Sequence, residues 1–196
     1  MNNTLHRRDV AKVLLADRGN SLVVAGLGSP IWDITAVEDS HANFPAWGGM
    51  GGAACMGLGL ALAQPERAVL VVTGDGEMLM GLGALATIGV ARPRNLSVVV
   101  MNNGQYGETG LQKAHTSLGV DLAGVATASG IERSFDVKDD QGVQQLANLI
   151  YTRQGPVFAS VRIHDEKLPP LVSPRDGAYL KNRFRIQLLG AAEAME

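Results

Sequence analysis

Two short polar motifs in the middle of the chain carry the types of side chain that bind cations. The apolar run VLVV leads into GDG at residues 74–76, and the run SVVVM leads into NNG at residues 102–104. If both runs are neighbouring parallel strands, the motifs meet at the carboxyl edge of the sheet, where ligands bind in open α/β folds. One carboxylate, one amide and nearby carbonyl groups suit Mg2+, which often bridges a protein to phosphate. We therefore expect a diphosphate cofactor at this edge.

Each motif alone has a plainer explanation, because GDG and NNG are also ordinary turn sequences in which glycine supplies a positive φ. The pair is more specific than either half. The intervening sequence, EMLMGLGALATIGVARPR, predicts one helix and a loop, which is the connection that two parallel strands need. The two motifs together therefore favour a ligand site over two unrelated turns.

With these motifs the chain resembles the thiamine diphosphate (ThDP)-dependent enzymes, whose signature pairs GDG with a later NN. Here 25 residues separate Gly76 from Asn102. The resemblance implies that Asp75 and Asn103 give side-chain oxygens to Mg2+ and that Gln105 adds its main-chain carbonyl. Gly76 and Glu77 would offer N–H groups to the diphosphate. The full set of cofactor-binding residues that we expect is Gly48, Gly49, Met50, Gly74, Asp75, Gly76, Glu77, Asn103, Gln105 and Tyr106.

Glu77 is a departure, since many members of the family carry Ser or Ala at this position. A carboxylate beside a diphosphate repels it unless the side chain points away. We therefore expect the Glu77 side chain to be turned from the cofactor.

A second segment, FPAWGGMGGAACMGLGLALA at residues 44–63, resembles the part of these enzymes that grips the two rings of ThDP. By this resemblance Met50 is the apolar prop that holds the cofactor bent, and the Gly48 carbonyl accepts a hydrogen bond from its amino group. A core methionine that fills a gap is the alternative for Met50. The glycines of the segment fit close backbone approach to a ligand, and they would equally serve a crowded core.

The loop that follows the second motif, residues 105–116, is the natural place for groups that meet the substrate. Here the chain is similar to small-subunit 2-oxo acid decarboxylases, the group that includes the sulfopyruvate and phosphonopyruvate enzymes. Glu108 could relay protons, and His115 could bind the anionic end of a substrate or act as an acid. With Met50, these are the expected catalytic residues. A solvated loop position is the alternative for Glu108, His115 and also His41.

The family needs a second domain, whose glutamate activates the pyrimidine of ThDP. The resemblance covers about residues 20–165, and the rest of the chain is too short for another α/β domain. We therefore expect a separate subunit to supply that glutamate, so that the chain works in a hetero-oligomer and is inactive alone. The expected function is the ThDP- and Mg2+-binding part of a 2-oxo acid decarboxylase.

Other functions stay open at this stage. Within enzymes, the alternatives are an acetolactate-synthase-like carboligase and a 2-oxo acid oxidoreductase subunit, although the one cysteine cannot supply an iron–sulfur cluster. A nonenzymatic nucleotide- or phosphate-binding module would use residues 26–30, GLGSP, as a dinucleotide loop. That loop lacks the third glycine of GxGxxG, and its proline is expected to break the helix entry.

Composition narrows the class further. Of 196 residues, 46% are hydrophobic and 18% charged, which predicts one well-cored domain over 1–196 with 165–196 as a C-terminal extension. The net charge of −2 favours neither nucleic acid nor an anionic membrane surface. The amino terminus has no apolar signal core and no segment is a membrane-span candidate, so we expect a cytoplasmic protein. Cys55 is expected to be a buried structural thiol.

The order of the predicted elements indicates an α/β fold with an open, mainly parallel sheet and helices on both faces. Apolar β-branched runs predict strands at 22–26, 68–73, 96–101, 131–137 and 157–163. Helices are expected at 5–18, with Thr4 as its cap, and at 51–63, 78–90, 122–130, 139–151 and 180–189. Residues 28–30 are expected to break the chain.

Overall fold

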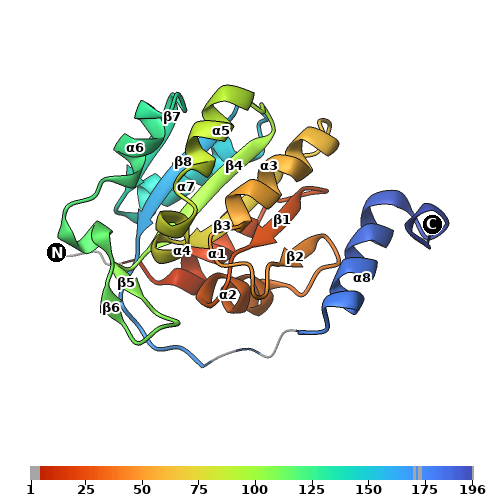
Figure 1. Ribbon diagram of the computed structural model, residues 1–196, viewed down its shortest axis with the longest axis horizontal. Helices are drawn as coiled ribbons and strands as arrows, with labels where there is room; N and C mark the ends of the chain where they lie inside the picture. Colours follow the sequence, from red (N-terminus) through yellow and green to blue (C-terminus); the bar gives the residue numbers. More distant parts are fainter. Residues whose placement is uncertain (1–4, 170, 172–173, 196) are drawn as a thin grey trace.

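A six-stranded, all-parallel sheet forms the centre of the computed structural model, which describes residues 5–169, 171 and 174–195 (Figure 1). The strand order is β2-β1-β3-β4-β8-β7. The predicted α/β class is confirmed. The strands are β1 (Leu22–Ala25), β2 (Asn43–Pro45), β3 (Val69–Gly74), β4 (Leu96–Asn102), β7 (Arg133–Val137) and β8 (Val157–Arg162).

Helices cover both faces of this sheet because its central strands are apolar on both sides. Alternate residues of a strand enter opposite cores: Val71 and Val98 lie in one cluster, Val72 and Val99 in the other. The first cluster lies under α3 (Ala53–Ala63), α5 (Ala84–Ala91) and α6 (Leu122–Ala128). The second lies under α1 (Arg7–Leu15), α2 (Ser29–Val37) and α7 (Asp140–Ile150). No described helix is long and apolar enough to cross a membrane.

The pairing of β3 with β4 brings the two polar motifs to one edge. The strands run in parallel register from Val69 opposite Leu96 to Gly74 opposite Met101. Asp75 follows β3 directly and opens the short helix α4 (Asp75–Met80), and Asn103 follows β4. The carboxyl edge of the sheet therefore holds both motifs, as the sequence predicts.

The single helix predicted at 78–90 is wrong, since the chain forms α4 and α5 with a break at residues 81–83. A contact distant in sequence explains the break. A Cβ at Gly81 would lie 2.1 Å from the carbonyl oxygen of Gly51, so the backbone of the glycine segment packs directly against this point. Only a glycine allows such an approach.

Residues 28–30 do not break the chain but begin α2, with Pro30 in its first turn. Proline is tolerated there because the first N–H groups of a helix have no intrahelical partner. Three short elements were not predicted: β2 and the hairpin of β5 (Gln105–Tyr106) and β6 (Gln112–Lys113). Strands of two or three residues are too short to show a periodic pattern.

The helix predicted at 5–18 is α1, and its proposed cap, Thr4, lies outside the described residues. Cys55 is exposed, so the prediction of a buried thiol is wrong. The side chains of α3 that enter the core come from Ala53, Ala54, Leu58 and Ala61, and Cys55 falls on the outer side. Because α3 has apolar or small residues all round, its pattern does not reveal which side is buried.

The C-terminal extension ends in a helix, α8 (Gly177–Leu189), that begins earlier than predicted because Asp176 caps it. The helix lies beside β2 at the edge of the sheet (Figure 1). The ring centroids of Phe184 and Phe44 are 5.3 Å apart, and Arg183 donates to Asp39 over 2.8 Å. The 3-10 turns η1 (His115–Leu118) and η2 (Glu193–Met195) complete the described elements.

The C-terminal end of α3 depends on one buried side chain, that of Asn95. Its Nδ2 atom donates to the carbonyls of Ala61, Gln64 and Arg67 over 3.0, 2.9 and 2.8 Å. We expect Asn95→Ala to lower the free energy of unfolding by about 2 kcal/mol, because three carbonyl groups lose a donor. Urea unfolding measures this change. Asn148→Ala, on the exposed side of α7, is the control and should change stability by less than about 0.5 kcal/mol; equal effects of the two variants would contradict the expectation.

Candidate functional site

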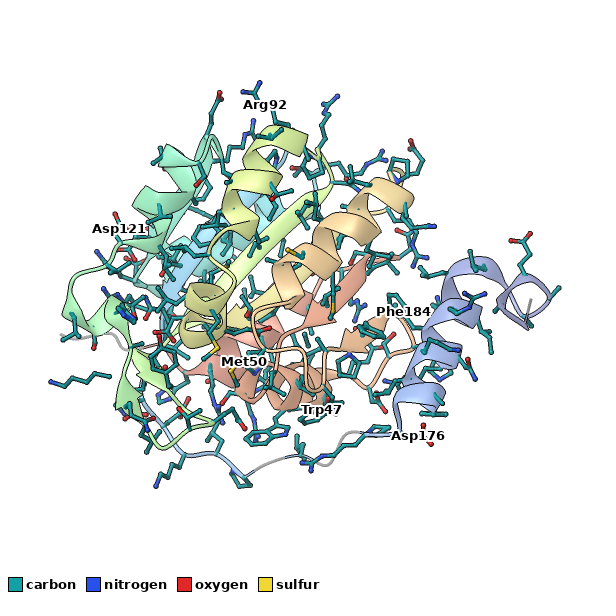
Figure 2. The ribbon with its side chains drawn as sticks, in the orientation of Figure 1. Trp47, Met50, Arg92, Asp121, Asp176 and Phe184 are labelled. Atoms are coloured by element: carbon teal, nitrogen blue, oxygen red, sulfur yellow. The ribbon has the colours of Figure 1, made fainter. Side chains whose placement is uncertain are left out.

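A cavity of about 510 Å3 lies at the carboxyl edge of the sheet, where the two motifs meet. Its wall includes Gly74, Asp75 and Gly76 from the first motif, and Asn103 from the second. Met50 also lines the cavity, and Figure 2 shows it below the carboxyl end of the sheet beside α4. Elements that are distant in sequence therefore converge on one space.

Asp75 is 2% exposed, although it stands at the end of a strand and lines the cavity. The hydroxyl of Thr116 donates to its Oδ2 atom over 2.5 Å. Burial raises the pKa of Asp75, and hydrogen bonds from Thr116 and from the backbone of Gly76 and Gly104 offset part of the shift. None of these groups carries a positive charge, so they do not neutralise the carboxylate of Asp75. A bound metal ion would do so.

The two asparagines that follow β4 have different surroundings. Asn102 is buried: its Nδ2 donates to Ser160 on β8 over 3.1 Å, and its Oδ1 accepts from the Gly104 N–H over 3.2 Å. Asn103 lines the cavity, and its Oδ1 accepts from the Gln105 N–H over 3.0 Å. Asn102 thus holds the turn in place, whereas Asn103 faces the ligand space.

Gln105 also lines the cavity, and only one of the two polar atoms of its side-chain amide is hydrogen-bonded. Its Nε2 donates to Asp165 over 2.8 Å, whereas its buried Oε1 has no hydrogen-bond partner. The three residues predicted as metal ligands, Asp75, Asn103 and Gln105, therefore lie around one cavity. Among the described residues no three His, Cys, Asp or Glu converge, so a metal here would depend on amide and carbonyl oxygens as well.

Glu77 is 7% exposed, and its carboxylate is bonded to the interior of the protein. Thr73 donates to Oε2 over 2.6 Å, and the Ala53 N–H donates to Oε1 over 3.4 Å. Burial raises the pKa of Glu77, with Thr73 and the backbone of Ala53, Gly51 and Leu27 acting in the opposite direction. The side chain thus fastens β3 to the first turn of α3 and to the loop after β1.

The same carboxylate bears on the alternative of a dinucleotide loop at residues 26–30. A Cβ at Gly26 would lie 1.9 Å from Oε2 of Glu77, and one at Gly28 would lie 2.6 Å from Oε1 of Glu108. Two carboxylates thus occupy the space beside the glycines of this loop. The glycines of this loop therefore give room to side chains of the chain itself, whereas those of a dinucleotide loop give room to phosphates.

Tyr106 connects the cavity to the loop that was expected to meet the substrate. A Cβ at Gly76 would lie 2.6 Å from the Tyr106 ring, so the ring packs directly over that glycine. The Tyr106 hydroxyl lies 3.1 Å from Nδ1 of His115. Glu108 is exposed and lines the cavity, whereas His115 is exposed and reaches the cavity only through Tyr106.

The remaining predicted residues lie farther out. Gly48, at φ +77, and Gly49 are not part of the cavity wall, and neither is the exposed His41. The structure thus gathers most of the expected cofactor-binding residues around one space. Gly48 and Gly49, which the sequence predicts as ring-binding residues, lie outside that wall.

Sequence reasoning missed one wall of the cavity, which comes from the first helix, from α2 and from the segment after β8. Arg7 and Asp33 are 6% and 1% exposed, and Arg7 Nε lies 3.5 Å from Asp33 Oδ2. Arg8 Nε lies 3.2 Å from Asp33 Oδ1. Burial raises the pKa of Asp33 to about 6, even though both guanidinium groups lower it. The only sequence signal was an arginine pair, which is common on helix surfaces.

The chain belongs to the thiamine pyrophosphate enzymes. The model of the family described as "Thiamine pyrophosphate enzyme, C-terminal TPP binding domain" matches residues 31–161. This span contains both motifs, the glycine segment and most of the sheet. The resemblance inferred from GDG and NN is therefore confirmed, and thiamine diphosphate is the cofactor of the family.

Relatives and solved structures agree with this assignment. The chain is 33% identical to the sulfopyruvate decarboxylase subunit beta of Methanococcus maripaludis, over 92% of this chain and 96% of that one. It is 43% identical to the phosphonopyruvate decarboxylase of Streptomyces hygroscopicus, over 83% of this chain but only 40% of that enzyme. The benzoylformate decarboxylase of Polynucleobacter necessarius shares the fold, with a TM-score of 0.66, 20% identity, and 85% and 34% of the two chains covered.

The buried carboxyl of Asp33 gives a test of stability against pH. Its folded-state pKa of about 6 exceeds the ordinary aspartate value of 3.8, so the folded state binds the proton more tightly. This group therefore stabilises the fold below about pH 4, and the contribution, roughly 3 kcal/mol, is lost as the pH rises through about 6. Urea unfolding from pH 4 to 7 should show this decline in the wild type and not in Asp33→Asn; parallel curves would contradict it.

Proposed function

We propose that this chain is the ThDP- and Mg2+-binding subunit of a heteromeric 2-oxo acid decarboxylase. The observation that carries the proposal is the convergence of Asp75, Asn103 and Gln105 on one cavity, in a chain of this family whose relatives include sulfopyruvate and phosphonopyruvate decarboxylases. ThDP, when bound, supplies a nucleophilic carbon that adds to a 2-oxo group and takes up the electron pair released with CO2. The protein supplies orientation and electrostatics.

The residues around the cavity fit a magnesium diphosphate. The Asp75 carboxylate, the Asn103 amide oxygen and the Gln105 main-chain carbonyl would hold Mg2+, which prefers oxygen ligands. The buried Asp75 carboxylate has only neutral donors, so a divalent cation would relieve the burial of its charge. A Cβ at Gly74 would meet nothing within 4 Å, which leaves space for phosphate oxygens close to the backbone. The N–H groups of Gly76 and Glu77 would donate to them.

The Glu77 carboxylate is compatible with this arrangement. Glu77 is part of the cavity wall, but its oxygens accept from Thr73 and from backbone N–H groups, so hydrogen bonds within the chain stabilise its charge. The sequence raised the concern that this carboxylate repels the diphosphate. In our proposal the N–H of Glu77 faces the cavity while its side chain holds the loop, which limits that repulsion.

Three side chains of this chain would act on the reacting groups. Met50 is 37% exposed at the cavity, where it would hold the cofactor in its bent shape, with the Gly48 carbonyl accepting from the amino group. Glu108, at the cavity, would move a proton to or from the substrate. His115 would bind the anionic end of the substrate or donate a proton, with Tyr106 fixing its ring through Nδ1.

A separate subunit completes this site in our proposal. The relatives named phosphonopyruvate decarboxylase are more than twice as long as the region that they share with this chain, whereas the relatives named sulfopyruvate decarboxylase subunit beta are matched over at least 90% of their length. The pyrimidine-binding domain, with its activating glutamate, would then come from the partner. The names of the relatives favour a small substrate with a second anionic group, such as sulfopyruvate or phosphonopyruvate.

The metal site is tested with Asp75. We expect Asp75→Ala and Asp75→Asn to fold as the wild type does and to lose at least roughly 100-fold in ThDP affinity, because the only carboxylate ligand is removed. Asn keeps the shape and removes a buried charge, so its unfolding temperature without ligand should not fall. Calorimetry with Mg2+ and ThDP on the assembled complex measures affinity; unchanged binding by either variant would remove the proposal.

Substitutions of Met50 test whether its side chain holds the cofactor in the bent shape. We expect Met50→Ala to lower kcat with sulfopyruvate or phosphonopyruvate by at least roughly 10-fold while ThDP affinity changes little, because the cofactor stays bound but loses its reactive shape. Met50→Leu keeps the apolar bulk and should retain most activity. Steady-state kinetics and calorimetry on the same complexes separate the two effects. A change in unfolding temperature alone would make Met50 a packing residue.

A further inference from the structure

Buried polar atoms without hydrogen-bond partners gather around the cavity. Within the described part of the chain, five buried side-chain nitrogen or oxygen atoms have no such partner, and four of them belong to residues of the cavity wall. Native proteins leave few buried polar atoms unpaired, so each of these needs a physical reason. The first two of the four are donors: Arg7 Nε, Trp32 Nε1, Asp33 Oδ2 and Gln105 Oε1.

Arg7, at the start of α1, places a buried positive charge in this wall. The residue is 6% exposed, and its Nε atom lies 3.5 Å from Asp33 Oδ2 in an ion pair that is not a hydrogen bond. Lys167 also lines the cavity but is exposed. Burying a guanidinium is costly unless its N–H groups are hydrogen-bonded as well as charge-paired. An anion in the cavity would accept from the donors that Asp33 does not use.

Asp33 lies between two arginines and is hydrogen-bonded to the other one. The Nε atom of Arg8 donates to Asp33 Oδ1 over 3.2 Å, and Arg8 is not part of the cavity wall. One carboxylate cannot neutralise two guanidinium groups. Arg8 therefore satisfies Asp33, whereas Arg7 is held beside the cavity by charge and keeps its donors for a ligand.

Two other carboxylates at this end of the cavity have partners of their own. Glu166 Oε1 accepts from the backbone N–H of Arg7 over 3.2 Å, and its Oε2 lies 3.0 Å from Nδ1 of His6. Asp165 accepts from Gln105 over 2.8 Å. Neither carboxylate forms an ion pair with the Arg7 guanidinium within the described residues. They therefore leave that guanidinium available to an anion.

Trp32 supplies a second donor at the same end. It precedes Asp33 on α2, which lies beside α1 (Figure 1), and its indole nitrogen is buried without a partner. A guanidinium can donate two parallel hydrogen bonds to an oxyanion, and an indole N–H can donate a third. We propose that Arg7 and Trp32 bind the second anionic group of the substrate, a sulfonate or a phosphonate; this inference rests on the proposed function.

This end of the cavity differs from the place proposed for the diphosphate. The residues proposed for Mg2+ and diphosphate follow β3 and β4, whereas Arg7 and Trp32 belong to α1 and α2. A substrate held by Arg7 at its anionic end would have its 2-oxo group positioned between the two places. The anionic end would then not need His115, which reaches the cavity only through Tyr106 and keeps the alternative role of proton donor.

The test uses the full-length chain coexpressed with its second subunit and loaded with Mg2+ and ThDP. Sulfoacetate and phosphonoacetate, which carry two anionic groups but no 2-oxo group, are the binding probes. We expect Arg7→Gln to weaken the tighter of the two at least roughly 10-fold in calorimetry, because a charged hydrogen-bond donor is lost. The value of kcat/KM with sulfopyruvate or phosphonopyruvate should fall by a similar factor, and ThDP affinity should stay within about twofold.

Arg8→Gln is the matched control. It also removes a guanidinium from Asp33, but it leaves the cavity wall unchanged, so probe affinity should stay within about twofold. Equal losses in the two variants would mean that both arginines act through Asp33 on the fold, and the inference would be wrong. A loss of ThDP affinity in Arg7→Gln without a loss of probe affinity would assign Arg7 to the diphosphate instead.

Two milder variants keep the inference testable if Arg7→Gln disturbs folding, which thermal unfolding checks. Arg7→Lys keeps the charge but loses the planar fork, so it should bind the probes more weakly than the wild type and more tightly than Arg7→Gln. Trp32→Phe keeps the ring and removes the N–H, and it should weaken the probes roughly 3-fold. Probe binding at wild-type affinity in both variants would overturn the inference.

Two outcomes with the wild-type complex separate this inference from the proposed function. If the complex binds ThDP and decarboxylates pyruvate as efficiently as sulfopyruvate and phosphonopyruvate, the decarboxylase function stands and the anion site is wrong. If sulfoacetate or phosphonoacetate binds in a manner that depends on Arg7 but ThDP does not bind, the proposed function fails and the anion site stands.

Discussion

The register between β3 and β4 is the constraint on which the site depends. The two strands pair in parallel from Val69 with Leu96 to Gly74 with Met101, so both end at the same edge. A slip of one residue would turn every side chain to the other face and would bury polar residues in one of the cores. The four valines at 71, 72, 98 and 99, at most 1% exposed, prevent such a slip because each must enter its own core. The position of Asp75 relative to Asn103 is thus set by hydrophobic packing.

Three buried carboxyl groups surround the cavity, and their partners indicate different roles. Asp33 has two guanidinium groups, Glu77 has a hydroxyl and backbone N–H groups on the inner side, and Asp75 has a hydroxyl and N–H groups beside the cavity. Burial raises the pKa of all three. The bonds of Glu77 join three elements, which is a structural task. Asp75 joins fewer parts of the chain and faces the space where a cation would stabilise it, which is what a ligand requires.

Features that depend on local pattern were predictable from the sequence, and features that depend on distant contacts were not. The apolar runs of β3 and β4, with GDG and NN at their ends, predicted the sheet edge and the family. The break between α4 and α5 depends on Gly51 meeting Gly81, and no local signal announces it. In the same way, Arg7 and Asp33 come from different helices and meet only in the folded chain. Exposure of Cys55 could not be read because α3 is apolar on every side.

Two neighbouring parts of the chain, its cavity and the outer sides of α3 and α5, bear on the proposed partner subunit. Its cavity is walled by the motifs predicted to bind the diphosphate, but the glycines expected to meet the rings of the cofactor are not part of that wall. Its helices α3 and α5 are apolar on the outside, whereas α1 and α7 have outer sides suited to water. In the proposed heteromer, a partner that completes the cavity would stand next to Met50, so assembly and cofactor binding would be coupled.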